Sequence, residues 1–380
     1  MIKALNTAFI QELREIKSSW YKLSLLIFLP LLCFALLVGI FYSGVATKLP
    51  VVVVDNDKSS LSKKLLFNIN ASPTLEIKYK VLDTISGINL VKSTKAYALL
   101  VIPNKFEKDT LLGLQPKVTL MLNTQFVLIG KMIKAALIEV VTTASGEVEY
   151  VKHLIEIKNS EESLAKTVPI NLQVTPFFNT YKNYFFFLVS ALLPAVWQIF
   201  IVIGTLVSFG TLFKSKGEES FFSKEHLFMS IVGKLLPYTL VYTLLGVAVL
   251  IYIYGFEGWI FQGSYGLMLL AIFFTVVAYQ AVSLLFFVTG FDYARSLSLG
   301  AVYTAPAFAF LGVTFPVSSM NSFALFWRDL LPISYYMEIQ ISQSNYGVNP
   351  FMEIDKLLYL TLFSLLFIPV YFRFKQRLGR

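Results

Sequence analysis

Few residues of this 380-residue chain have the types and spacing that catalysis requires. Two carboxylate pairs, Asp55/Asp57 and Glu161/Glu162, are close enough in sequence to act as an acid–base pair or to hold a cation. Each pair also has a plainer interpretation. The first follows the apolar run Val51–Val54 and suits the turn at the end of a strand, and the second suits a solvated helix face. We therefore expect neither pair to be catalytic and neither to hold a metal.

Motifs for nucleotide, nucleophile, zinc or thiol chemistry are absent from the sequence. It contains no G-x-x-x-x-G-K-[ST], G-x-S-x-G, H-E-x-x-H or C-x-x-C. The single cysteine, Cys33, allows no internal disulfide, and the two histidines, His153 and His226, are far apart. We expect no catalytic residues, no bound cofactor and no His/Cys metal site, so the chain is not expected to be an enzyme.

Lys234 is the only charged residue between Met229 and Tyr254, inside a long apolar run. Such a residue can serve as a coupling charge in a transport pathway, or it can anchor a helix by extending to the membrane interface. The second interpretation is favoured here. No pair of carboxylates lies within an apolar run. A carrier driven by protons or sodium usually needs such a pair, so we expect the energy source to lie on another protein.

The segment 211–228 is a short charged stretch between two apolar runs. It carries the adjacent carboxylates Glu218 and Glu219, with interleaved lysines and aromatic residues that include Phe221, Phe222 and Lys224. This mixture suits a short amphipathic helix beside a membrane. It is either an ordinary loop or a docking element for a soluble partner.

The elements that must position these residues are membrane helices. The chain is 56% hydrophobic and 14% charged, whereas about a quarter of the residues of a soluble domain are charged. Because about 20 apolar residues cross a bilayer, the pattern predicts a polytopic α-helical membrane protein with six transmembrane helices. The expected spans are 23–42, 184–210, 230–254, 265–288, a fifth beginning near 297, and 357–372. Helices two to six therefore occupy 183–372, and a basic tail follows at 373–380.

The segment before the first span, 1–22, has apolar residues at spacings of three and four. This spacing predicts an amphipathic helix at the membrane interface, with Glu12 on its polar side. A helix packed into a small cap is the alternative. We expect the span that follows to be retained rather than cleaved as a signal peptide, because acidic residues precede it and no clear cleavage site follows.

Two further segments interrupt the apolar pattern. Residues 43–182 alternate strand-like runs, at 51–54, 75–81, 97–102 and 118–122, with helical stretches. This alternation predicts an inserted α/β domain that depends on its own core, since it has no disulfide. Residues 318–337 mix polar and apolar residues and suit a segment that enters the membrane and returns.

The distribution of basic residues predicts the orientation. With the N-terminus inside, most Lys and Arg residues near the spans lie on inner segments, whereas the short outer loops hold only Arg328 and Lys356. This bias places both termini and 211–228 in the cytoplasm and makes 43–182 extracytoplasmic. The net charge of +9 is then explained by topology, and no nucleic-acid partner is expected.

Five short motifs occur in order along the chain, at 51–62, 71–73, 98–107, 233–238 and 311–336. In their sequences and in their places relative to the expected spans, these motifs resemble those of the ABC-2 type permeases, the transmembrane subunits of ATP-binding-cassette exporters. The similarity is greatest to the bacterial branch with a large external domain after the first helix, and it covers nearly the whole chain.

The resemblance implies a dimer of permease chains, identical or not, served by cytoplasmic ABC ATPase subunits that bind the ATP. It also implies a coupling helix with an acidic residue between the second and third spans. By position Glu218 or Glu219 fills that role, with Phe221, Phe222 and Lys224 beside them. Gly217 stands where the family often has arginine, and Phe178-Asn179-Thr180 lacks the proline usual in this branch.

On this basis we expect the chain to form the pathway for efflux of a small-molecule, drug-like or lipid-like substrate across the bacterial inner membrane. Membrane lipids and a periplasmic adaptor are further candidate partners. The alternative is a polytopic envelope receptor or anchor that binds a partner through its external domain. Alternating access requires helices that can bend. The candidate hinges are Pro194, Gly204, Pro306, Gly312 and Pro316.

Overall fold

The computed structural model describes residues 1–379 except 43, 45, 158–182, 184 and 224. The chain divides into two compact units. The helical unit consists of Met1–Gly44 and Pro176–Arg380, and the sheet unit consists of Val45–Thr175. The sheet unit is therefore inserted into the sequence of the helical unit. Within the helical unit, Gly44, with a left-handed φ of +65°, lies directly against the side chain of Asn183.

The helical unit is built from long apolar helices. Within the described residues, five helices are long and apolar enough to cross a membrane. They cover Trp20–Phe41, Phe185–Lys214, Leu227–Phe256, Tyr265–Val288 and Pro350–Leu378. The prediction of a polytopic helical membrane protein is confirmed at this level.

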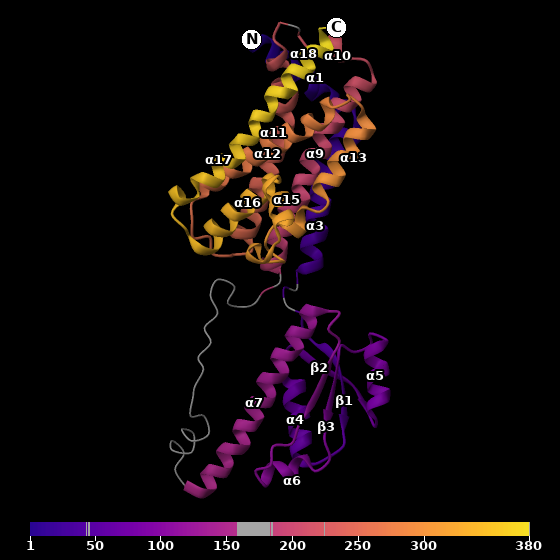
Figure 1. The fold of residues 1–380 in the computed structure, drawn as a ribbon, viewed down its shortest axis with the longest axis vertical. Helices are drawn as coiled ribbons and strands as arrows, with labels where there is room; N and C mark the ends of the chain where they lie inside the picture. The colour runs from indigo at the N-terminus through magenta and orange to yellow at the C-terminus, as the bar shows by residue number, and fades with distance from the viewer. Residues whose placement is uncertain (43, 45, 158–182, 184, 224, 380) are drawn as a thin grey trace. The chain divides into compact units, whose positions relative to one another are not determined.

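Several of these helices contain short 3₁₀ or π-helical turns and therefore consist of more than one element. The first comprises α2 (Trp20–Leu23), η1 (Ser24–Phe28) and α3 (Leu29–Phe41). The second comprises η2 (Phe185–Val189) and α9 (Ser190–Lys214), and the third comprises α11 (Leu227–Ile251) and η3 (Tyr252–Phe256). The fourth is α12 (Tyr265–Val288). The last comprises η6 (Pro350–Glu353), α17 (Ile354–Leu362), η7 (Phe363–Leu366) and α18 (Phe367–Leu378). Figure 1 labels the main parts of these helices α3, α9, α11, α12, α17 and α18.

The region predicted as the fifth span is broken. It contains α13 (Tyr293–Thr304) and the four-residue α14 (Ala307–Phe310), separated at Pro306. The 12 residues of α13 extend for about 18 Å, which is less than the ~30 Å hydrocarbon core of a bilayer. Proline lacks the amide hydrogen that continues a helix, so Pro306 explains where the long helix stops.

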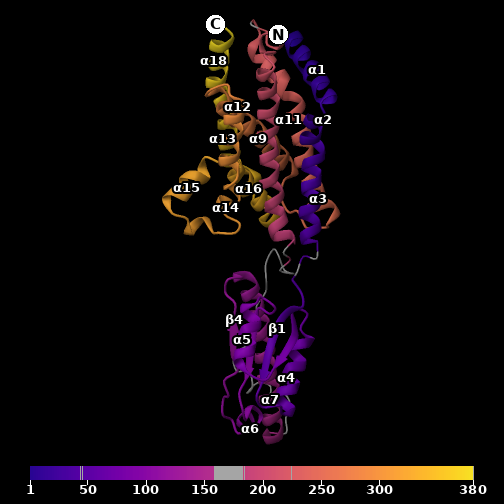
Figure 2. The same ribbon diagram turned by 90° about the vertical axis from the view of Figure 1, so that its right-hand side faces the viewer.

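The segment predicted to enter the membrane and return forms two short helices. After the 3₁₀ turn η4 (Val317–Ser319) come α15 (Ser322–Asp329) and α16 (Pro332–Ile341), followed by the π-helical turn η5 (Ser342–Tyr346). Asn321 caps α15 by accepting a hydrogen bond from the Ala324 amide at 2.9 Å. Within the helical unit, α14 and α15 lie toward the end away from both termini (Figure 2).

The core of the helical unit is centred on α9, which packs against α11, α12 and α13. Buried polar side chains join these helices. The indole of Trp197 donates to the carbonyl of Tyr242 at 2.9 Å, and Thr239 donates to the side chain of Gln280 at 2.9 Å. Hydrocarbon offers no competing hydrogen bonds, so such contacts hold membrane helices in fixed register.

The sheet unit contains a four-stranded sheet of order β2-β1-β3-β4. Its strands are β1 (Leu49–Asp55), β2 (Leu75–Val81), β3 (Ala98–Ile102) and β4 (Thr119–Leu122). β1 pairs in parallel with β2 and β3, and β4 is antiparallel to β3. The helices are α4 (Ser60–Ala71), α5 (Thr84–Lys92), α6 (Phe106–Leu111) and α7 (Val127–Ile157). The strands predicted from the sequence are all found within about two residues of these bounds.

Helices on both faces explain the run of four valines in β1. Val51 and Val53 face a core formed with α4 and α7, whereas Val52 and Val54 face a second core that includes residues of α5 (Figure 1). Each of the four valines is at most 1% exposed. A strand buried on both faces has a continuous apolar run rather than an alternating one.

The carboxylate pair after β1 shapes the turn into α4 and the start of α6. Asp55 accepts hydrogen bonds from the amides of Asp57 and Lys58 at 3.1 and 2.9 Å. Asp57 reaches across to the next strand–helix connection and accepts from the amide of Glu107 at 3.0 Å. Burial alone would raise the pKa of Asp57, but hydrogen bonds from Ser59 and from the amides at the start of α6 outweigh it and lower the pKa below 3.8.

We predict that Asp57→Asn weakens the first turn of α6 by about 1 kcal/mol, the usual contribution of a capping carboxylate. A carboxylate with a lowered folded-state pKa stabilises the fold above its unfolded pKa and loses this effect as the pH falls through the folded value. The difference between wild type and variant should therefore be full well above pH 3.8 and disappear only as the pH falls through the lower folded-state pKa. Hydrogen exchange of amides 106–111 in the full chain measures it. Glu76→Gln, an exposed change on β2, is the control, and equal exchange in Asp57→Asn and wild type would contradict the assignment.

Candidate functional site

The loop between α9 and α11 is short, and its two faces differ. After α9 ends at Lys214, the chain turns through Lys216, whose φ is +54°, into the single helical turn α10 (Glu218–Phe221). Glu219 and Ser220 are exposed, whereas Phe221 and Phe222 are only 5% and 3% exposed. Both chain termini and α10 lie at the same end of the helical unit (Figure 1). The loop thus presents a polar face outward and an aromatic face inward.

The inward face of the loop belongs to a phenylalanine cluster. The ring of Phe222 lies 5.1 Å from that of Phe221 and 5.6 Å from that of Phe374 on α18. Phe213, at the end of α9, lies 5.0 Å from Phe287 on α12. The whole cluster comprises Phe209, Phe213, Phe221, Phe222, Phe287, Phe291 and Phe374. Aromatic contacts at these separations stabilise beyond the burial of apolar area, so the loop is fixed against α9 and α18.

The structure distinguishes among the five loop residues that the sequence analysis grouped together. Glu219 is open to a partner, and Glu218 is partly buried. One carboxylate oxygen of Glu218 is inaccessible to water and accepts no hydrogen bond within the described part of the chain. Phe221 and Phe222 face the chain's own core, and Lys224 lies outside the described residues. Of the described members, only the two carboxylates can therefore meet a partner in this conformation.

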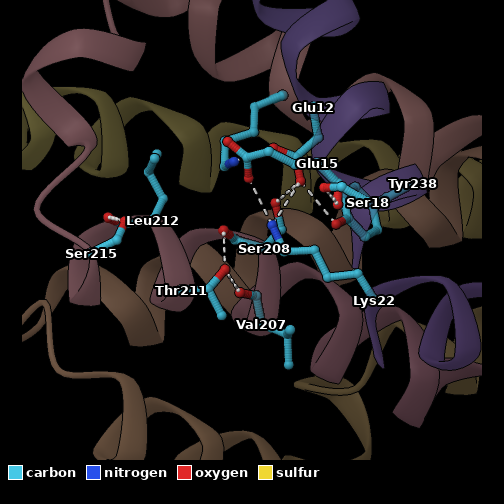
Figure 3. Close-up of polar contacts among 11 residues, drawn as sticks. Glu12, Glu15, Ser18, Lys22, Val207, Ser208, Thr211, Leu212, Ser215 and Tyr238 are labelled. Carbon is cyan, nitrogen blue, oxygen red and sulfur yellow. Dashed lines mark hydrogen bonds and ion pairs between the residues drawn. The ribbon is translucent and has the colours of Figure 1, made fainter. Parts of the chain in front are cut away.

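Beside the loop lies a buried set of polar side chains, here called the Glu12 cluster: Glu12, Lys22, Ser208, Lys234 and Tyr238. Glu12 is carried by α1 (Ile2–Ser18) and is completely buried, as is Lys234 of α11. The carboxylate of Glu12 forms an ion pair with Lys234. It also accepts hydrogen bonds from Ser208 of α9 and Tyr238 of α11, both at 2.9 Å (Figure 3).

The charges of this region balance. Lys22, on α2, lies 3.7 Å from Glu12 and forms a closer ion pair, at 2.8 Å, with Glu15 (Figure 3). Two lysines therefore face two carboxylates. Charged side chains within membrane helices are costly unless they are paired, and this pairing explains how Lys234 is accommodated with 0% exposure.

Two predictions about these residues were wrong. Glu12 does not lie on a polar side of α1, and Lys234 is not an anchor that extends to the interface, because both are fully buried and paired with each other. The buried residues of α1 are Ala8, Glu12 and Ile16, four apart on the face that meets α11. Two features of the sequence could have indicated this ion pair. Glu12 is in phase with the apolar residues of its helix, and a single lysine within an apolar helix is costly unless a carboxylate pairs with it.

A glycine permits this close approach of α1 and α11. A Cβ atom added at Gly233 would lie 2.5 Å from the carbonyl oxygen of Leu5 and 2.9 Å from the Cβ of Ala8. Small residues at helix contacts allow membrane helices to approach at backbone distance. Gly233 therefore places the neighbouring Lys234 within reach of Glu12.

The five candidate hinge residues fall into two groups. Pro306, Gly312 and Pro316 lie where the helices are interrupted, and Gly312 has a left-handed φ of +81°. Pro194 and Gly204 lie inside the continuous helix α9, where Gly204 receives the hydroxyl end of Tyr242. The first group therefore interrupts helices, whereas Gly204 serves close packing.

Elsewhere in the helical unit, an apolar groove of about 640 Å³ lies between α12, α13, α15 and α17. Its lining includes the aromatic residues Trp327, Tyr303 and Tyr335, and Asp329 is the only charged residue among the described residues that line it. Among the residues that the structure describes, no group of three His, Cys, Asp or Glu side chains could hold a metal ion. The groove suits an apolar molecule rather than an ion.

Comparison with known families is consistent with this arrangement of helices. The model of the family described as ABC-2 family transporter protein matches residues 21–372. No curated protein matches the chain. The match includes the inserted sheet unit as well as the long apolar helices, and it extends over nearly the whole sequence.

Proposed function

Because the chain belongs to the ABC-2 family of transporter proteins, we propose that it is the permease subunit of an ATP-driven exporter. The family forms the membrane component of transport systems and is not itself catalytic. ATP binding and hydrolysis belong to a separate ABC ATPase subunit, which is the partner that membership of this family implies in general.

The observation that carries the proposal is the two-sided loop around α10. Its outward face offers Glu219 and part of Glu218, and its inward face is packed against α9 and α18. A force applied by a soluble partner at the carboxylates would therefore reach α9 and α18 directly, and α12 through Phe213 of α9. A loop that only connected two spans would not need this packing.

The proposed orientation follows from the basic residues that flank the helices. Both termini and α10 lie at one end of the helical unit, and that end is proposed to face the cytoplasm of a bacterial cell. The sheet unit is then extracytoplasmic. In this orientation α10 is accessible to a cytoplasmic ATPase.

The complete exporter is proposed to contain a second permease chain, identical or related, as well as the ATPase subunits. The cargo is proposed to be small and drug-like or lipid-like. The apolar groove with its aromatic lining supports this class, since pockets for such molecules are mostly apolar with few polar groups. A periplasmic adaptor that meets the sheet unit would complete the export path.

We predict that reversing both loop charges, with Glu218→Lys and Glu219→Lys, abolishes co-purification of the ATPase subunit. Like charges placed across an interface cost several kcal/mol, so binding should weaken about 100-fold. Reversal of two exposed carboxylates of the sheet unit, Glu76→Lys and Glu139→Lys, is the control matched in charge. Retained ATPase binding and transport in the loop variant would reject the docking role of the two carboxylates. A wild-type chain that binds no ATPase and moves no cargo would instead favour the alternative, an envelope receptor.

A further inference from the structure

The side-chain nitrogen of Lys234 joins the Glu12 cluster to the α10 loop. One side of this ammonium forms the ion pair with Glu12 of α1. The other side lies over the ring of Phe221, 4.2 Å from its centroid, and 5.6 Å from the centroid of Phe209 on α9. Lys234 thus contacts the N-terminal helix, the loop and the second span at once.

The attraction between Lys234 and its neighbours is strengthened because all the side chains involved are buried. Glu12 and Lys234 are 0% exposed and Phe221 is 5% exposed. A cation over an aromatic face attracts most strongly where water is excluded. The ion pair also determines where the ammonium can sit, since Ser208 and Tyr238 hold the same carboxylate from α9 and α11.

We propose that Glu12 and Lys234 are positioning residues that hold the α10 loop in its docking conformation through the ring of Phe221. Glu12 fixes the ammonium of Lys234, and the ammonium fixes Phe221. The neighbouring carboxylates Glu218 and Glu219 are then presented to the ATPase in one orientation. A displacement of the loop is transmitted through the same contact to α1 and α11. This inference rests on the proposed function for its consequence in transport, but not for the contact itself.

In this arrangement α1 has a role that its sequence does not suggest. An amphipathic N-terminal helix at a membrane surface would only anchor the chain. Here α1 contributes the carboxylate that sets the position of a cation on α11, and this cation contacts the loop. Loss of the ion pair between Glu12 of α1 and Lys234 should therefore loosen the loop. Glu12 acts on the loop through Lys234, which contacts Phe221.

A double-mutant cycle on the permease alone tests the contact. The combined change Glu12→Gln/Lys234→Met removes both charges, while the amide introduced on α1 keeps an oxygen that accepts from Ser208 and Tyr238. Phe221→Leu keeps an apolar side chain but removes the aromatic face. The charge-free variant and Phe221→Leu should each speed hydrogen exchange of amides 217–223 about tenfold. The two changes combined should have no larger effect than either one, since both remove the same contact between Lys234 and Phe221.

Phe222→Leu is the matched control. It removes the adjacent buried ring, which packs on Phe374 and faces the phenylalanine cluster. Its effect on exchange should add to that of Glu12→Gln/Lys234→Met. If Phe221 only filled space in the core, as Phe222 does, the effects of Phe221→Leu and Phe222→Leu would both add to that of the charge-free variant. Additive effects for Phe221→Leu, or unchanged exchange in the charge-free variant, would overturn the inference.

The second arm uses the permease together with the ATPase in proteoliposomes. Glu12→Gln/Lys234→Met retains the docking carboxylates, so the ATPase should still co-purify, whereas cargo moved per ATP hydrolysed should fall about tenfold. If the wild-type chain binds no ATPase, the proposed function fails and the exchange experiment still decides the contact. If the ATPase binds and transport per ATP is unchanged in the variant, the positioning role fails and the proposed function stands.

Discussion

Replacing Glu12 by leucine is expected to destabilise the helical unit by about 3–5 kcal/mol, the cost of leaving a buried charge without its partner. In the variant, Lys234 would remain in an environment with 0% exposure and with no carboxylate beside it. For a unit of this size the loss corresponds to a fall in melting temperature of roughly 10 °C. Thermal unfolding of the purified chain in detergent, followed by size-exclusion recovery, measures it.

A double variant distinguishes the effect of the unpaired charge on stability from the effect of a changed side-chain volume at position 12. Glu12→Gln/Lys234→Met removes both charges and keeps an oxygen on α1 that accepts from Ser208 and Tyr238, and removal of both partners of a buried ion pair is often neutral. This double variant should recover stability to within about 1 kcal/mol of the wild type, because Lys22 keeps its partner Glu15 at 2.8 Å. Glu15→Leu, at a partly exposed position, should cost less than about 1 kcal/mol. A wild-type melting temperature for Glu12→Leu would show that the cluster is not needed.

The second large effect is expected at Gly233, where leucine should destabilise the helical unit by about 3 kcal/mol. The atom that a side chain would meet first is the backbone carbonyl oxygen of Leu5, at 2.5 Å from the added Cβ. A backbone atom cannot rotate aside as a side chain can, so α1 itself must move away from α11. That movement would also break the contact between Glu12 and Lys234.

The control for Gly233→Leu is Gly39→Leu. Gly39 lies in α3, another apolar helix, and an added Cβ there meets nothing within 4 Å. Thermal unfolding should be nearly unchanged in this variant. The effects of Gly233→Leu and Glu12→Leu should not add, because either change separates the same two helices. Full additivity would indicate that Gly233 and Glu12 stabilise independent contacts.

Most helices and strands of the fold could be predicted from the sequence, because they depend on local patterns of apolar residues. Four consecutive valines in β1 and the long uncharged run of α9 each have one plausible environment, a strand buried on both faces and a membrane helix. The broken fifth span was harder to predict. Its composition is apolar throughout, but Pro306 stops the helix after 12 residues, and hydropathy alone does not register the missing hydrogen bond.

The candidate site was only partly predictable because its contacts join distant parts of the chain. The adjacent Glu218 and Glu219 could be found by position between two spans. The inward direction of Phe221 and Phe222 could not, since it depends on rings contributed by α9 and α18. Glu12 and Lys234 are 222 residues apart, and each alone has an ordinary interpretation as an interfacial charge. Only the packing of α1 on α11 shows that they are partners.

The central claim is that an ATPase acts on this chain from the cytoplasm through α10. Glu219→Cys, in a chain with Cys33→Ser, can be treated in intact cells with a maleimide that does not cross membranes. Gln262→Cys, exposed in the loop between α11 and α12, serves as the reference for the opposite side. The account predicts that residue 262 is labelled in intact cells, that residue 219 is labelled only after the membrane is opened, and that the purified ATPase subunit then protects it. Labelling of residue 219 in intact cells would place α10 outside the cell and contradict the account.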